Sequence, residues 1–307
     1  MKTLNDYILE GFDRPKPLKF DVDSSVDYWS IDRLNFHTLA DFHRDPKLFK
    51  AGFFKDKEPT PAMMFGSALH CKLLQPKEFG DKYALFDPPI NPKTGEAFGA
   101  STKTYAEALA ACAKENAGKS LISSAEYELI NRMVDEFFFH PVAPLLFDND
   151  NDDATEIADV EQTIIGSLSF DGTAEHAVDV KGRVDAYSST SGLIDVKTTA
   201  SLDDCTGKDR FRFAVYDYKY LPQLAFYHRI LRESYGAPYV PVWLVVFEVN
   251  EPNRVAVYTP TVETLEKAYR VVDVWLEQWV DAKQRGTYAS KYDDVQIIDA
   301  YIAERDY

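Results

Sequence analysis

The sequence predicts a mixed α/β fold in which helices surround a central mixed sheet. Apolar residues recur at helical spacing in the first half of the chain and again near its end. Between about residues 157 and 200 the pattern changes to the alternation of apolar and polar residues that is typical of strands. The resulting order is helix, three strands, helix and strand, with additional flanking helices, and it favours helices packed around one sheet.

Four helices are expected before the strands, at about residues 30–45, 61–75, 101–116 and 123–138. Ser30 is the expected N-cap of the first helix, and the Asp-Pro pair at 45–46 is its expected end, because proline disfavours helix in the residue before it. The second helix lies between Pro61 and Pro76. The proline- and glycine-rich stretch that follows, DPPINPKTGEAFG (87–99), is expected to be a loop.

The three strands are expected to form an antiparallel meander. Their segments are IADVEQTIIGSLSF (157–170), AVDVKGRVDAY (177–187) and LIDVKTTA (193–200). An Asp-Gly turn separates the first two segments, and SSTSG leads into the third. The elements expected after the meander are a helix at about 218–235, a buried strand at 239–249, a neighbouring strand at 254–260 and a long amphipathic helix at 262–286.

The chain is expected to form one domain. Residues 1–29, rich in Asp, Pro and Lys, are expected to form an extended N-terminal segment, and residues 30–307 a single domain with a helical insertion at about 76–147. No apolar run approaches the roughly 20 residues that cross a bilayer, and the N-terminus lacks a signal-peptide pattern. Three scattered cysteines form neither a disulfide framework nor a paired metal motif. A cytoplasmic location without membrane contact is therefore expected.

The formal net charge of −16 argues against general binding of nucleic acids, because neutralising phosphates requires clustered Lys and Arg. It does not exclude a nucleic-acid enzyme whose basic residues line one cleft. Part of the excess is local, since DNDNDDATE (148–156) is expected to be a solvated acidic loop.

The tripeptide Asp-Val-Lys occurs twice, at 179–181 and at 195–197. Side chains two residues apart on a strand share one face, so each copy places a carboxylate beside an ammonium. Only the second copy has a carboxylate, Asp185, across a short hairpin, where adjacent strands lie about 5 Å apart. Two such carboxylates chelate a hard cation, and Lys197 adds positive charge beside it. The alternative is a surface hairpin with cross-strand ion pairs.

Two helices carry further candidates. His70 in FGSALH projects over Gly66 and Ser67, which leave space for a metal or a phosphate. Gln223 and Tyr227 in QLAFY are four residues apart and share one helix face. Taken singly, each of these residues also fits a core or surface position.

Taken in this order, the motifs resemble the PD-(D/E)XK nuclease superfamily, most closely its RecE-type exonucleases (exodeoxyribonuclease VIII). The resemblance spans about residues 30–286, although Val184 stands where the motif is named for proline. The residues that carry it are His70 in FGSALH, Asp185 in KGRVDAY, Asp195 and Lys197 in LIDVKTT, and Gln223 and Tyr227 in QLAFY.

The resemblance implies an exonuclease that depends on Mg²⁺, with Mn²⁺ as a substitute, and degrades linear double-stranded DNA from 5′ ends. The product would be a 3′ single-stranded tail for a RecT-like annealing protein. RecE-type enzymes form ring oligomers around DNA, so a homo-oligomer is expected, with a tetramer favoured.

The resemblance also implies roles for individual residues. Asp185 and Asp195 would hold the metal, with His70 and the carbonyl of Val196 as further ligands. Lys197 would orient or help to deprotonate the attacking water. Gln223 and Tyr227 would position the scissile strand. A second metal would be completed by Glu161, with Glu156 or Asp159 as alternatives.

Contacts with DNA are expected from basic and polar residues around this site: Lys181, Arg183, Thr198, Arg210, Arg212 and Lys219. The last three belong to the basic and aromatic run KDRFRFAVYDYKY (208–220), for which a solvated loop is the alternative. Two other functions stay open: a catalytically silent nuclease-like module that binds DNA ends or proteins, and a metal-dependent hydrolase of small substrates.

Overall fold

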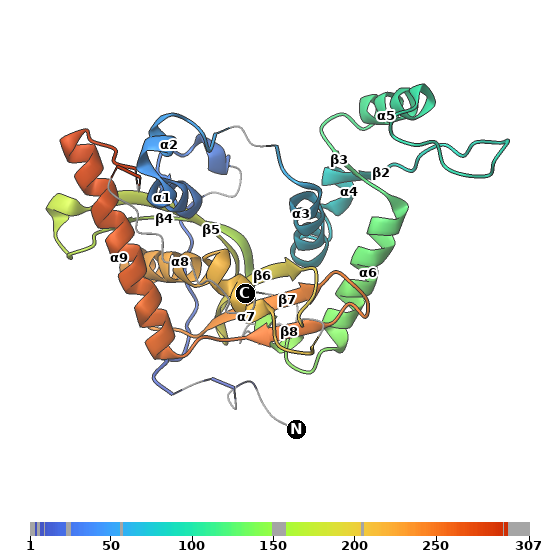
Figure 1. The fold of residues 1–307 in the computed structure, drawn as a ribbon. Coiled ribbons are helices and arrows are strands. Elements are labelled where there is room, and N and C mark those ends of the chain that lie inside the picture. The colour runs from blue at the N-terminus through green and yellow to red at the C-terminus, as the bar shows by residue number, and fades with distance from the viewer. Residues whose placement is uncertain are drawn as a thin grey trace, which may run out of the picture.

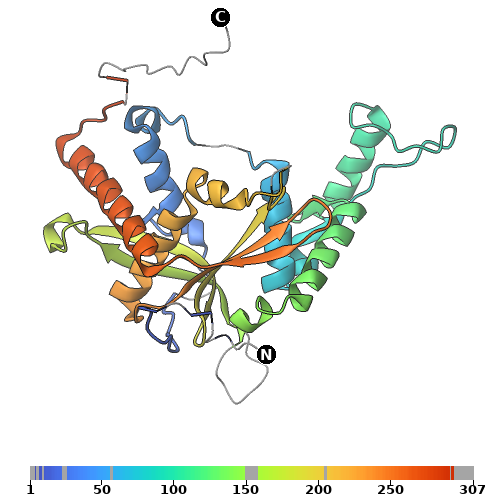
Figure 2. The same ribbon diagram turned by 60° about the horizontal axis from the view of Figure 1, so that its bottom comes forward.

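The fold is known from a computed structural model. It describes residues 4, 7–8, 10–22, 26–55, 58–148, 158–203, 206–290 and 292–293. The core is a six-stranded mixed sheet made of β1 (Leu34–Asn35), β4 (Asp159–Leu168), β5 (Val178–Ser188), β6 (Gly192–Thr199), β7 (Val242–Glu248) and β8 (Val255–Tyr258). Helices cover both faces of the sheet (Figures 1 and 2). The predicted α/β class is confirmed.

The three central strands form the predicted antiparallel meander. β4 pairs with β5 along its length except at Glu161, and β5 pairs with β6 over three residues next to their hairpin. β7 then lies parallel to β6, and β8 returns antiparallel to β7. A parallel neighbour requires a crossover connection, which the helices between β6 and β7 provide.

Alternation along β7 divides the core into two layers. Leu244 and Val246 pack with the helices α1 (Phe36–Arg44), α8 (Tyr220–Tyr235) and α9 (Val262–Arg285). Val245 and Phe247 point to the other face, where α3 (Pro61–Leu74) and α6 (Ser124–Phe139) pack. All seven residues of β7 are buried, as expected for a strand covered on both faces.

The remaining elements are short, except for α5. They are η2 (Tyr28–Ser30), α2 (Pro46–Lys50), α4 (Phe79–Lys82), β2 (Tyr83–Leu85), α5 (Lys103–Glu115), β3 (Ser120–Ile122), η3 (Pro144–Phe147), η4 (Ala174–His176) and α7 (Phe211–Asp217). α5 projects from the body beside the β2–β3 pair (Figure 1). α6, by contrast, belongs to the core, because Met133 and Phe137 are buried in the same cluster as Val245 and Phe247 of β7. No helix in the described ranges has the length and apolar character to cross a membrane.

Two expectations about the helices were wrong. The first helix begins at Phe36 instead of following Ser30, because Leu34 and Asn35 pair with β5 and the Asn35 side chain caps the helix through Thr38 N. The helix expected from about 218 is preceded by a separate one, α7.

Candidate active site

Asp185 lies where β5 and β6 separate. The backbone pairing of these strands ends at Ala186 and Ile194. Beyond this pair, the Asp185 side chain takes the place of a backbone acceptor: its Oδ2 accepts a hydrogen bond of 2.7 Å from Val196 N. The carboxylate is thereby fixed beside the strand that carries Asp195 and Lys197.

His70 approaches the same carboxylate from α3. Its Nε2 lies 2.9 Å from the carbonyl oxygen of Val196. A carbonyl only accepts, so Nε2 carries the proton and donates it. The other ring nitrogen, Nδ1, lies 3.7 Å from Asp185 Oδ2. In neutral imidazole, Nδ1 is then an acceptor that faces a second acceptor, the Asp185 carboxylate. A cation or a second proton between the two atoms would satisfy both.

Glu161 completes a three-residue cluster with His70 and Asp185. One ligand atom of each residue lies within 4.8 Å of the other two. Glu161 occupies the left-handed backbone region with φ of 51°, and the β4–β5 ladder is interrupted there, between Val160 and Gln162. Such a conformation costs a non-glycine residue about 1–3 kcal/mol, so the surrounding structure must hold it. Burial, and secondly the Asp185 carboxylate, raise the pKa of Glu161 to about 7.

The alternatives to Glu161 lie elsewhere. Asp159 is exposed at the start of β4 and is not part of the cluster. Glu156 lies outside the described residues.

Asp195 and Lys197 form a buried ion pair next to this cluster. Lys197 Nζ lies 2.5 Å from Asp195 Oδ2, although no hydrogen bond of good geometry reaches that oxygen from any described residue. Burial raises the pKa of Asp195 to about 6, against the lowering effect of Lys197. Burial alone would lower the pKa of Lys197, but the Asp195 and Asp185 carboxylates outweigh it and raise it. Lys197 therefore stays protonated at neutral pH.

These donors fit a hard divalent cation. The cluster offers an imidazole nitrogen and two carboxylates, a ligand set suited to Mg²⁺, Mn²⁺ or similar ions. The facing acceptors of His70 and Asp185 are a feature that a cation would satisfy. Sequence reasoning paired Asp185 with Asp195 as main ligands; the structure groups Asp185 with His70 and Glu161, and pairs Asp195 with Lys197. The Val196 carbonyl, also expected as a ligand, accepts from His70.

Gln223 and Tyr227 lie together beneath the site, both buried in α8. Gln223 Nε2 donates to Tyr227 Oη at 3.1 Å. The Tyr227 ring packs on Gly182 of β5 so closely that a Cβ at Gly182 would lie 2.8 Å from it. This contact fixes α8 against the strand that carries Asp185.

The residues expected to contact DNA differ in whether their side chains are accessible. Arg183 is exposed, with its guanidinium 4.8 Å from the centre of the Tyr28 ring, and Thr198 is half-buried near Gly66 of α3. Lys181 is instead buried, and its Nζ donates to the carbonyls of Tyr28 and Ile31 at 2.7 and 2.8 Å. Its ammonium thus serves the fold and is not presented to a phosphate.

Three of the four basic residues of the 208–220 run, Arg210, Arg212 and Lys219, lie on or beside α7. For this run, the sequence left open a DNA-binding segment or a solvated loop. Arg210 is exposed, Arg212 pairs with Asp209, and Lys219 Nζ lies 4.7 Å over the Tyr216 ring. One neighbour of the site was missed altogether: the Tyr220 ring lies 5.1 Å from Lys197 Nζ. Its position three residues before Gln223, on the same helix face, was the available signal.

Comparison with known proteins agrees with this geometry. The family described as PDDEXK-like domain of unknown function (DUF3799) matches residues 36–299. No curated protein matches the chain. A crystal structure from Eubacterium rectale, titled "Putative exonuclease", is similar with a TM-score of 0.56 and 13% identity, over 93% of this chain and 97% of that one. At this identity the likeness shows the fold. The chain thus belongs to the PDDEXK-like DUF3799 family, within the PD-(D/E)XK nuclease superfamily.

Proposed function

We propose that this protein is a divalent-metal-dependent nuclease that hydrolyses phosphodiester bonds in DNA. The observation that carries the proposal is the cluster of His70, Glu161 and Asp185 next to the buried pair of Asp195 and Lys197. Buried charges are costly to desolvate, and a cluster of buried titratable groups with shifted pKa values, here Glu161 and Asp195, is typical of a functional site.

His70, Glu161 and Asp185 would hold the metal, with Asp195 beside them. When bound, a divalent cation there would supply an activated water and stabilise the charge on a phosphate in the transition state. Lys197 keeps its proton at neutral pH and so places a fixed positive charge at the edge of the cluster, where it would orient water and offset phosphate charge. Burial and the Asp185 carboxylate raise the pKa of Glu161 to about 7 without a metal, and a bound cation would favour the charged form that serves as a ligand.

The resemblance to RecE-type exonucleases supports a finer assignment. The substrate would be linear double-stranded DNA, degraded from 5′ ends with Mg²⁺ or Mn²⁺, to leave 3′ single-stranded tails. A RecT-like annealing protein would then use these tails in recombination. The same resemblance supports a ring-shaped homo-oligomer, with a tetramer favoured. Light scattering that finds only monomer at micromolar concentration would contradict the oligomer.

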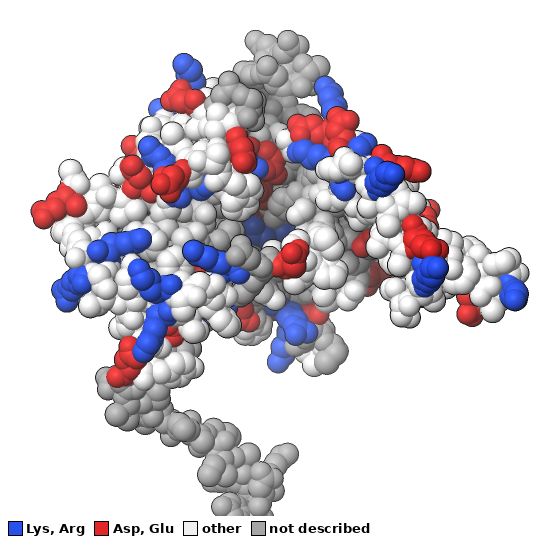
Figure 3. All heavy atoms as spheres, turned by 90° about the horizontal axis from the view of Figure 1, so that it is seen from above, with Lys and Arg blue, Asp and Glu red and all other residues white. Residues whose placement is uncertain are grey.

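The surface offers local cations for DNA despite the net charge. Figure 3 shows a hollow near the middle of the face seen from above, with basic as well as acidic side chains around it. Arg183 and Arg210 are both exposed. Local cations of this kind fit an enzyme that holds DNA at one place on an otherwise repulsive body.

The decisive test is digestion of end-labelled linear, nicked and covalently closed circular DNA, with and without Mg²⁺. We expect the linear substrate alone to be degraded rapidly, only with metal, and from the 5′-labelled end. Rapid cutting of closed circles would exclude an exonuclease. Absence of cleavage with Mg²⁺ and with Mn²⁺ would favour the silent binding module instead.

A further inference from the structure

Helix α7 and the residue that follows it, Tyr218, expose three large aromatic side chains. Phe213, Tyr216 and Tyr218 are 68%, 76% and 69% exposed. Phe213 and Tyr216 are three residues apart and therefore share one face of α7. Phe211, which is buried and stacks on Tyr220, holds the helix on the core from the opposite side. The exposed rings therefore do not serve the packing of α7.

This aromatic surface leads to the candidate active site. The Tyr218 ring stacks on the Tyr220 ring with centroids 5.7 Å apart, and Tyr220 in turn contacts Lys197. α7 is also the next helix in the chain after β6, the strand of Asp195 and Lys197. In both ribbon views it lies between α1 and α3, which flank the site (Figures 1 and 2).

The charges around α7 differ from those of the whole protein. The stretch 208–220 contains four basic and two acidic residues, in a chain of net charge −16. Lys219 lies over the Tyr216 ring, and Arg210 is exposed and makes no ion pair with any residue that the structure describes. Aromatic faces and cations thus alternate along the surface.

This combination fits a nucleic-acid strand with unpaired bases. Exposed bases stack on aromatic side chains, while cations between the rings meet the phosphates. A duplex hides its base faces and would use only the cations. An apolar segment of a protein partner would use only the rings. A single strand uses both.

We propose that Phe213, Tyr216 and Tyr218 form a stacking platform that binds unpaired bases at the end of the DNA, next to the cleavage site. The inference rests on the proposed nuclease function and specifies its substrate: an end at which the two strands have separated or already differ in length. The platform holds the single strand in line with Tyr220 and Lys197.

The test compares Phe213→Ala/Tyr216→Ala with a matched control, Phe138→Ala/Phe139→Ala, which removes two exposed rings at the end of α6. Binding is measured by fluorescence anisotropy at one fixed salt concentration with Mg²⁺, in a Lys197→Ala background that limits cleavage. The probes are a labelled oligothymidylate, a blunt duplex and the same duplex with a single-stranded tail. Circular dichroism checks the fold of each variant.

We expect the α7 variant to lose about fivefold or more in affinity per ring for the oligothymidylate and the tailed duplex. Its affinity for the blunt duplex, and that of the α6 variant for every probe, should change less than twofold. Unchanged binding of the single-stranded probe, or an equal loss for the blunt duplex, would overturn the platform. Absence of metal-dependent cleavage by the wild-type protein would overturn the nuclease proposal instead, so the two failures are distinguishable.

Discussion

The two Asp-Val-Lys copies lie on neighbouring strands, and their surroundings give them different tasks. In the first copy, Asp179 is 68% exposed beside Arg33, and Lys181 is buried under the backbone of Tyr28 and Ile31. In the second, Asp195 and Lys197 are buried against each other next to the cluster of His70, Glu161 and Asp185. The two tripeptides are identical, so the difference in their burial and contacts comes from residues that are distant in the sequence.

Asp195→Asn should abolish metal-dependent cleavage, with a loss of about 10²-fold or more, while the fold persists. The substitution removes a charge at nearly constant volume, from a position where burial disfavours the charge. Cleavage rates and far-UV circular dichroism would check both parts. Asp179→Asn is the matched control on the exposed copy and should keep its activity; an active Asp195→Asn protein would refute the assignment.

Lys181→Met should lower the free energy of unfolding without acting on chemistry directly. It leaves two carbonyls without their donor, and each unsatisfied buried group costs about 1–3 kcal/mol. Urea denaturation would measure the loss, with Lys114→Met on the exposed side of α5 as the control. If Lys181 instead bound DNA, the variant would keep its stability and lose affinity for DNA.

At the scale of elements, the contact between α8 and β5 depends on Gly182. Gly182→Ala would place a methyl group 2.8 Å from the Tyr227 ring, and the ring is held by the hydrogen bond from Gln223. Overpacking of this kind costs about 1–3 kcal/mol. We expect a lower midpoint in urea and slower cleavage. Gly80→Ala in α4, where a Cβ would meet nothing within 4 Å, should change neither.

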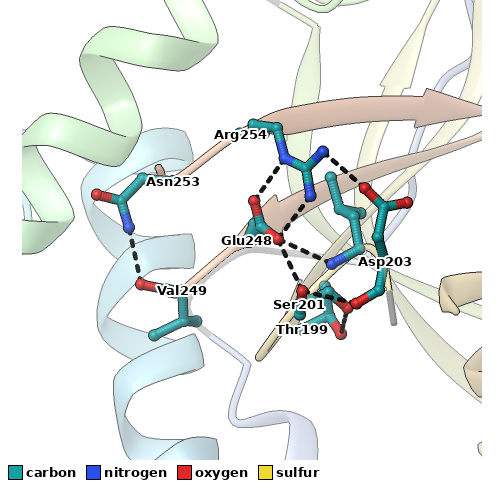
Figure 4. A network of polar contacts seen from close by, with 8 residues as sticks. Thr199, Ser201, Asp203, Glu248, Val249, Asn253 and Arg254 are labelled. Atoms are coloured by element: carbon teal, nitrogen blue, oxygen red, sulfur yellow. Dashed lines mark hydrogen bonds and ion pairs between the residues drawn. The ribbon is translucent and has the colours of Figure 1, made fainter. Parts of the chain in front are cut away.

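The β7–β8 hairpin holds the loop between β6 and α7 through one carboxylate. Glu248 is buried, and both of its oxygens accept hydrogen bonds from Arg254, at 2.7 and 2.9 Å (Figure 4). It also accepts from Ser201 and from Leu202 N. Arg254 in turn binds Asp203. Hydrogen bonds, that from Arg254 first, lower the pKa of Glu248 from 4.5 to about 2.

The lowered pKa of Glu248 predicts how the stability of the protein changes in acid. A carboxyl with a depressed folded-state pKa stabilises the fold above its unfolded pKa, and this contribution is lost as the pH falls from about 4.5 towards 2. Glu248→Gln should therefore destabilise the protein by about 3 kcal/mol near pH 6 and by progressively less below pH 4.5. Urea denaturation at several pH values would show it. Glu107→Gln, on exposed α5, is the control; a pH-independent difference would contradict the argument.

The sequence predicted those elements whose signals are local. The meander, β7, α3, α8 and α9 follow from periodicity and from capping or turn residues within each segment. The start of α1 could not be predicted in this way, because it depends on the pairing of Leu34 with Val180, which is distant in the sequence. The motif residues His70 and Asp185 were likewise identifiable. Glu161 was predicted only as one of three alternatives for a second metal, since its place beside His70 and Asp185 depends on a left-handed residue and an interrupted ladder.

For the molecule as a whole, the net charge of −16 requires that DNA be held by local basic groups on a repulsive body. Binding should therefore fall steeply with salt, since each neutralised phosphate releases counterions. Affinity for a linear duplex, measured in the Lys197→Ala background, should drop by orders of magnitude between about 50 and 200 mM salt if six or more phosphates are contacted.

Arg210→Gln should weaken this binding and make the salt slope shallower by about one unit, because Arg210 is exposed and would contribute one phosphate contact. Lys114→Gln on α5 removes one charge from the projecting arm and serves as the control with equal net charge. An equal change in slope for both variants would mean that overall charge, not a local surface, governs binding. A slope near zero for the parent protein would exclude phosphate-dominated binding altogether.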